Sequence, residues 1–110
     1  MAIPHAASGD LIDIRPLGAT LRQTPSSTLI RVDHLEVLRL VLPKGKVAAE
    51  HRAAGAITIQ CLEGVTELQA HGRTQTLRAG DLVYLADAVP HAVTALEDSS
   101  LLLTMLLHRA

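Results

Sequence analysis

The stretch that decides the fold is residues 56–85, AITIQCLEGVTELQAHGRTQTLRAGDLVYL. It contains four short runs of apolar or alternating residues, separated by glycine-containing turns at 63–64, 71–72 and 79–81. Short runs at this regular spacing are typical of a sandwich or barrel of antiparallel strands. Turn residues recur too often to leave room for an amphipathic helix of ten or more residues. The stretch therefore predicts an all-β domain.

The same rhythm continues on both sides of this stretch. Upstream, residues 35–42 form an apolar run that ends at a Pro-Lys-Gly turn, and downstream residues 91–96 and 101–107 form two more runs. Residues 47–56 are rich in alanine, but the flanking glycines and strand-turn rhythm argue against a helix there. Near the start, residues 11–15 are expected to form a short edge strand, and residues 19–27 a loop or a weak strand. We predict a single domain over 1–110, with an N-terminal arm and edge strand at 1–28 and a barrel at 29–110.

Composition excludes several classes of protein. The chain has 110 residues, 48% of them hydrophobic and 19% charged, which is not the composition of a disordered protein. The net charge is −1 and lysines and arginines form no run, so the charge pattern of a nucleic-acid-binding protein is missing. No segment reaches the roughly 20 apolar residues of a membrane span. Cys61, the single cysteine, cannot form an internal disulfide, which suits the cytoplasm. We therefore expect a cytoplasmic protein that binds neither nucleic acid nor membrane.

Glycines and histidines recur at spacings that resemble those of the cupin family. In the first cupin motif Gly45 is followed by five residues and His51, and Gly64 closes the motif. In the second, Gly80 precedes His91 at the expected distance. The chain is similar to small single-domain cupins of the cupin 2 conserved-barrel type. The resemblance implies a jelly-roll-like barrel, the double-stranded β-helix, and a homodimer.

The chain departs from this family at positions that matter for metal binding. In metal-binding cupins two histidines and a glutamate of the first motif join the second-motif histidine around one ion. Here Ala53 and Ile57 stand at the second histidine and glutamate positions. The resemblance leaves His51 and His91 as candidate ligands for a divalent transition metal such as nickel, zinc, iron or manganese. Because most metal sites recruit three or more protein ligands, we expect weak metal binding or none.

Three functions are compatible with such a barrel. The first is binding of a small molecule of unknown specificity, with His51, His91, Ile57 and Ile59 as candidate contacts and His51 and His91 close together inside the barrel. The second is a metal-dependent enzyme, dioxygenase- or isomerase-like, that uses the same two histidines. The third is a cupin without a site that acts as a dimeric binding or regulatory module. Catalytic residues are not identified by the sequence.

Two further expectations concern packing. Cys61 shares a strand face with Ile57 and Ile59, so it is expected in the core as a small hydrophobic residue. Tyr84 is expected in the core or at an interface. The strand at 35–42 is apolar on both faces, and we expect the second face to contact a partner in a symmetric dimer.

Overall fold

The computed structural model describes residues 5–51 and 55–107, and the side chains of residues 49–51 lie outside this description. Strands are the main secondary structure of the described residues, and the one helical element among them is a short 3-10 helix. The elements are η1 (Gly18–Gln23), β1 (Ser27–Val32), β2 (Leu35–Leu42), β3 (Val47–His51), β4 (Ile57–Glu63), β5 (Val65–Ala70), β6 (Arg73–Arg78), β7 (Leu82–Leu85), β8 (His91–Ala95) and β9 (Ser99–Leu106). The predicted all-β fold is confirmed, and residues 47–51 form a strand and not a helix.

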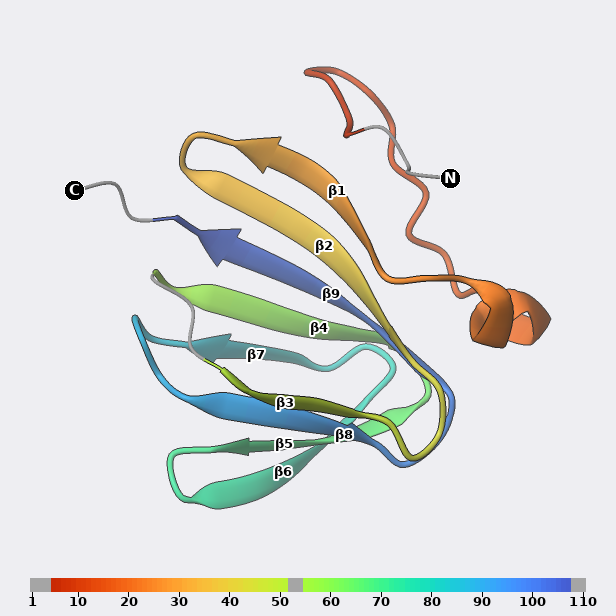
Figure 1. Ribbon diagram of the computed structural model, residues 1–110, viewed down its shortest axis with the longest axis vertical. Helices are drawn as coiled ribbons and strands as arrows, with labels where there is room; N and C mark the ends of the chain where they lie inside the picture. Colours follow the sequence, from red (N-terminus) through yellow and green to blue (C-terminus); the bar gives the residue numbers. More distant parts are fainter. Residues whose placement is uncertain (1–4, 52–54, 108–110) are drawn as a thin grey trace.

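Two antiparallel sheets make up the barrel (Figure 1). The five-stranded sheet, here called sheet A, has the order β1-β2-β9-β4-β7. The four-stranded sheet, here called sheet B, has the order β3-β8-β5-β6. The chain crosses between the sheets repeatedly, so β9 near the C-terminus lies between β2 and β4. Long-range pairing of this kind is typical of a jelly roll.

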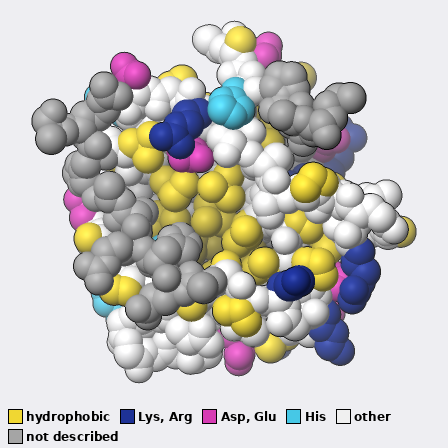
Figure 2. All heavy atoms as spheres, in the orientation of Figure 1, with side chains coloured by type: hydrophobic (Ala, Val, Ile, Leu, Met, Phe, Trp, Pro, Cys, Tyr) yellow, Lys and Arg dark blue, Asp and Glu magenta, His cyan; other side chains and the backbone are white. Residues whose placement is uncertain are grey.

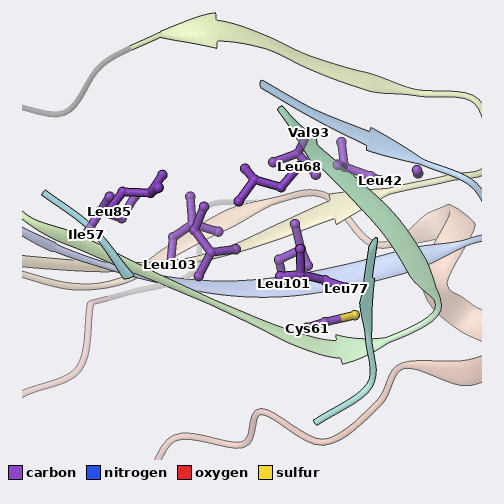
Figure 3. Close-up of a cluster of buried hydrophobic side chains, with 11 residues drawn as sticks. Leu42, Ile57, Cys61, Leu68, Leu77, Leu85, Val93, Leu101 and Leu103 are labelled. Carbon is purple, nitrogen blue, oxygen red and sulfur yellow. The ribbon is translucent and has the colours of Figure 1, made fainter. Parts of the chain in front are cut away.

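The core between the two sheets is almost entirely aliphatic. Figure 3 shows side chains from both sheets pointing toward one another, with Cys61 as the single sulfur among them. Figure 2 shows hydrophobic side chains gathered in a hollow near the centre of one face. Cys61 is fully buried, which confirms the expectation that it packs as a small hydrophobic residue. The buried cluster comprises Leu42, Ile57, Ile59, Cys61, Leu68, Leu77, Leu85, Val93, Ala95, Leu101 and Leu103.

A glycine turn joins β4 to β5 at the place the sequence predicts. Gly64 has φ +85°, and a Cβ built on it would lie 2.2 Å from the Asp98 carbonyl oxygen. Both the left-handed backbone and the close approach therefore require glycine. The turn lets β4 leave sheet A and β5 enter sheet B.

The N-terminal region differs from the prediction. Residues 11–15 form no strand, and residues 18–23 form η1 rather than a loop or a weak strand. The Arg15 N–H donates to the Asp13 carboxylate, and Arg39 of β2 donates to the Ile14 and Arg15 carbonyls. These side chains use backbone groups that a strand would have paired in a ladder. Strand β1 begins at Ser27, so the expected boundary at 28/29 falls inside it.

This N-terminal segment covers part of the outer face of sheet A. Val37, Arg39 and Val41 point away from the core-facing side of β2 but are at most 9% exposed. The Val41 N–H donates to the Ser26 hydroxyl, just before β1. The second apolar face of β2 is thus covered in part by the same chain, and at these positions it does not need a second copy.

Candidate functional site

The backbones of His51 and His91 are direct partners in sheet B. His51 ends β3, His91 begins β8, and the two residues pair across the antiparallel ladder. Directly opposed residues on antiparallel strands have Cβ atoms roughly 4.5–5.5 Å apart. The His51 side chain lies outside the described residues, so the expected proximity of the two rings stays a prediction. Two neighbouring rings would require this backbone pairing of His51 with His91.

His91 is held in a buried position at this end of the barrel. It is 1% exposed, and its Nδ1 lies 3.1 Å from the Val89 carbonyl oxygen. A carbonyl oxygen only accepts, so Nδ1 donates this hydrogen bond. His91 also pairs with Ala70 of β5.

The loop before His91 carries the Val89 carbonyl, and one residue of this loop has an unusual backbone conformation. Ala88 has φ +60°, in the left-handed region that favours glycine. It stands at the position where the second cupin motif has its second glycine. The Val89 N–H bonds back to the Ala86 carbonyl, which closes a turn over residues 86–89. The turn keeps the geometry of the motif although alanine has replaced glycine.

Ile57 and Ile59 are core residues of β4. They are 2% and 1% exposed, respectively, and both belong to the buried cluster between the sheets. Ile57 pairs with Leu85 of β7 and Met105 of β9. They form an aliphatic wall inside the barrel, as expected, but neither lines the cavity found next to His91.

That cavity lies at the end of the barrel where β5 turns into β6. It has a volume of about 520 Å³, and its lining includes Ala70, Arg73, Val89 and Pro90. Ala70 is the ladder partner of His91, and Val89 holds the His91 ring. The sequence analysis did not single out these lining residues. A signal for them existed in the His71-Gly72 turn and in the position of Pro90 directly before His91.

The described residues do not fit the metal site of the family. No group of three or more His, Cys, Asp or Glu side chains that would hold a metal ion occurs within 5–48 and 55–107. Ile57, at the glutamate position, is packed among hydrocarbon side chains. Ala53, at the second histidine position, lies outside the described residues. With no carboxylate at position 57, a divalent ion would lack its anionic ligand.

The other residues considered from the sequence lie away from this end of the barrel or are solvated. Burial raises the pKa of the Cys61 thiol, which is therefore protonated at neutral pH. Tyr84 is 66% exposed on the outer face of sheet A, so it is not a core residue. His34 is exposed in the β1–β2 turn, whereas His71 is exposed in the β5–β6 turn and lines the cavity.

The fold and the spacing of its motifs define a class of small β-barrel proteins. Residues 38–107 match the Cupin domain family model, Cupin_2. The chain belongs to this family, as the sequence resemblance implied. No curated protein matches it.

Solved structures share the fold at low sequence identity. A conserved protein of unknown function from Streptococcus pyogenes is 22% identical with a TM-score of 0.76, over 100% of this chain and 97% of that one. A cupin superfamily protein from Desulfitobacterium hafniense is 17% identical with a TM-score of 0.77, over 94% and 100%. A variant of salicylate 1,2-dioxygenase from Pseudoaminobacter salicylatoxidans is 20% identical with a TM-score of 0.68, over 73% and 25%. At this identity the likeness concerns the fold alone.

Of the helical elements in the described ranges, none has the length and apolar character needed to cross a bilayer.

Proposed function

We propose that the chain binds a small molecule at the end of the barrel that carries His51 and His91. The observation that carries this proposal is the backbone pairing of the two histidines beside a cavity of about 520 Å³. A concave site with an apolar wall and a few convergent polar groups is typical of small-molecule binding. Ile57 and Ile59 supply aliphatic surface deeper in the barrel.

The chemistry of this end favours a ligand with one polar end and an aliphatic body. The imidazole rings of His51 and His91 can bind a polar group, and Arg73 at the cavity lining is a fixed positive charge. A hydroxyl or carboxylic acid group of the ligand is complementary to such a pair. An aliphatic body gains from burial against the apolar lining of the cavity, which includes Ala70, Val89 and Pro90, at about 25 cal/mol per Å² of apolar surface.

The test is a ligand screen by thermal shift with short aliphatic acids, alcohols and amides, followed by titration of any hit. We expect His51→Ala and His91→Ala each to weaken binding by about tenfold or more, the equivalent of a lost hydrogen bond of ~1.4 kcal/mol. His34→Ala, which removes an exposed histidine from the β1–β2 turn, is the matched control. No hit in the screen, or hits that both histidine variants bind as well as the wild type, would contradict the proposal and favour a barrel that serves as a dimeric binding or regulatory module.

The metal-dependent enzyme is the alternative that uses the same residues. We infer weak or no metal in protein purified without added metal, because Ala53 and Ile57 carry no donor atoms. Ala53→His with Ile57→Glu should raise the affinity for nickel or zinc by orders of magnitude. Ala53→His alone is a second variant that retains the core residue Ile57. Elemental analysis that finds stoichiometric iron, manganese or zinc in the native protein would favour the enzyme.

We also infer a cytoplasmic homodimer. The lone, buried Cys61 needs no oxidising compartment. Exposed hydrophobic residues remain on the outer face of sheet A, beyond the N-terminal segment, and they support a contact with a second copy.

A further inference from the structure

A second cavity lies on the other side of sheet A from the barrel interior. It has a volume of about 510 Å³ and is an open cavity between the N-terminal segment and the outer face of the sheet. Its apolar lining includes Ala6, Ile12, Leu17 and Leu29. None of the residues around His91 contributes to it. The two cavities are therefore separate, and this one needs its own explanation.

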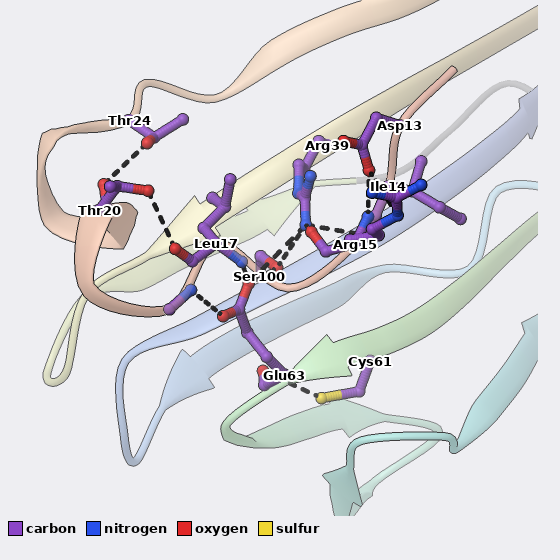
Figure 4. Close-up of polar contacts among 11 residues, drawn as sticks. Asp13, Ile14, Arg15, Leu17, Thr20, Thr24, Arg39, Cys61, Glu63 and Ser100 are labelled. Atoms are coloured by element: carbon purple, nitrogen blue, oxygen red, sulfur yellow. Dashed lines mark hydrogen bonds and ion pairs between the residues drawn. The ribbon is translucent and has the colours of Figure 1, made fainter. Parts of the chain in front are cut away.

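Arg39 supplies a buried polar group to this second cavity. It is 7% exposed, and its Nη2 donates to the Ile14 and Arg15 carbonyls and approaches the Ser100 hydroxyl at 3.4 Å (Figure 4). Its Nε–H has no hydrogen-bond partner among the residues that the structure describes. Buried donors without an acceptor are rare in folded proteins, since leaving one unpaired is costly. Because Arg39 lines the cavity, an acceptor atom of a ligand bound there would satisfy this donor.

The charges around the cavity define the rest of the ligand. Arg39 is balanced by Glu63, whose Oε2 lies 3.7 Å from its Nη2. Asp10 and Asp13 line the cavity, and Arg15 lies 3.8 Å from Asp13. These two positive and three negative groups leave one net negative charge. A carboxylate ligand would add to that charge, whereas an ammonium group would neutralise it.

We propose that this cavity is a second binding site, for a small aliphatic amine that also carries a neutral carbonyl, such as an amino acid amide. The carbonyl accepts the hydrogen bond from Arg39 Nε, and the ammonium group donates to the carboxylates of Asp10 and Asp13. The alkyl side chain lies against the apolar lining. Each part of the ligand meets a group that the cavity already presents, as in small-molecule sites generally.

The test is titration of the full chain with leucinamide and two analogues, followed by amide NMR shifts. The analogue 4-methylpentanamide lacks the ammonium group, and 3-methylbutylamine lacks the carbonyl. We expect each analogue to bind at least about tenfold more weakly than leucinamide, which corresponds to ~1.4 kcal/mol for each lost contact. The shifts should lie at Leu17, Gly18 and Leu29. Absence of leucinamide binding, or equal binding of all three compounds, would overturn the proposal.

Four variants test whether leucinamide binds at this cavity, at the barrel end or elsewhere on the surface. Asp13→Asn changes an exposed carboxylate and should weaken leucinamide binding severalfold, whereas Asp33→Asn in the β1–β2 turn is the matched control and should not. Arg39→Lys keeps the positive charge but removes the Nε donor, so it should abolish the preference for leucinamide over 3-methylbutylamine. His91→Ala should leave leucinamide affinity unchanged. Loss of binding in His91→Ala, or unchanged binding in Asp13→Asn, refutes the assignment.

Discussion

At the scale of single residues, Ala88 stands at a glycine position of the cupin motif and has a left-handed backbone conformation. Its φ of +60° is a conformation that costs a non-glycine residue about 1–2 kcal/mol. The turn holds because the residues around it fix the loop, including the Val89 carbonyl that accepts from His91. Local strain of this kind is maintained by surrounding structure.

We expect Ala88→Gly to stabilise the protein by about 0.5–1 kcal/mol, because relief of the left-handed strain exceeds the added entropy of the unfolded chain. Ala86→Gly is the matched control, since Ala86 has no positive φ, and it should be neutral or destabilising. Urea unfolding followed by circular dichroism measures both. A loss of stability in Ala88→Gly would show that the loop carries no such strain.

Glu63 is a residue through which pH affects the stability of the fold. Burial alone raises the pKa of its carboxyl group, but hydrogen bonds from the Leu17 N–H, the Ser100 hydroxyl and the Gly18 N–H outweigh it, and Arg39 adds to them. The pKa therefore lies below its usual value of 4.5. A group with a lowered pKa contributes stability that is fully present above its unfolded-state pKa and is lost as the pH falls through the folded-state pKa.

We therefore expect the free energy of unfolding to fall as the pH drops below about 4.5, and Glu63→Gln to flatten that fall. At neutral pH Glu63→Gln should destabilise the protein, since it removes the charge that balances the buried Arg39. The measurement is a series of urea unfolding curves between neutral and acidic pH. Asp98 also has a lowered pKa, with the hydrogen bond from the Lys44 N–H as its main cause. Its contribution to the pH dependence is present in both the wild type and Glu63→Gln. Equal pH slopes for the wild type and Glu63→Gln would contradict this account.

At the scale of elements, the attachment of η1 tests whether the N-terminal segment is part of the folded unit. Leu21 is the buried residue of η1, at 2% exposure, whereas Leu11 in the same segment is fully exposed. We expect Leu21→Ala to cost about 2–5 kcal/mol through lost burial and an unfilled cavity. The matched Leu11→Ala should stay within about 0.5 kcal/mol of the wild type. Chemical unfolding of both variants decides, and a negligible cost for Leu21→Ala would mean that η1 is not docked.

The strands were predictable where turn chemistry and alternation agree. Strands β2, β5, β6 and β7 lie at the predicted residues, because a glycine-containing turn bounds each run on at least one side. Residues 11–15 have the composition of a strand but form none, since their carbonyls are taken by Arg39, a long-range contact that local pattern does not encode. For the candidate site, the motif spacing led to the expectation that His51 and His91 lie close together, and their backbones pair across β3 and β8. It did not predict the cavity, whose lining comes from two turns distant in sequence.

At the scale of the whole molecule, the two faces of sheet A have different roles. Its inner face packs on sheet B, and its outer face is covered by the N-terminal segment near β2. Further along the outer face, hydrophobic side chains remain exposed on β1, β7 and β9. The strand register places these side chains on the same face as Val37. They are Val32, Leu82, Tyr84 and Leu106, each between 53% and 66% exposed.

This exposed band makes the dimer testable. A specific dimer buries on the order of 1,600 Å² in total, with aromatic residues enriched at its centre, and Tyr84 is the only aromatic side chain of the chain. We expect Tyr84→Glu to convert the dimer to a monomer, since it places a charge in a desolvated contact. Val47→Glu on sheet B is the matched control, because Val47 is 56% exposed and faces away from the barrel on the other side of the molecule. Sedimentation velocity at micromolar concentration measures both, and a monomeric wild type, or equal dissociation by Val47→Glu, would place the contact elsewhere or exclude it.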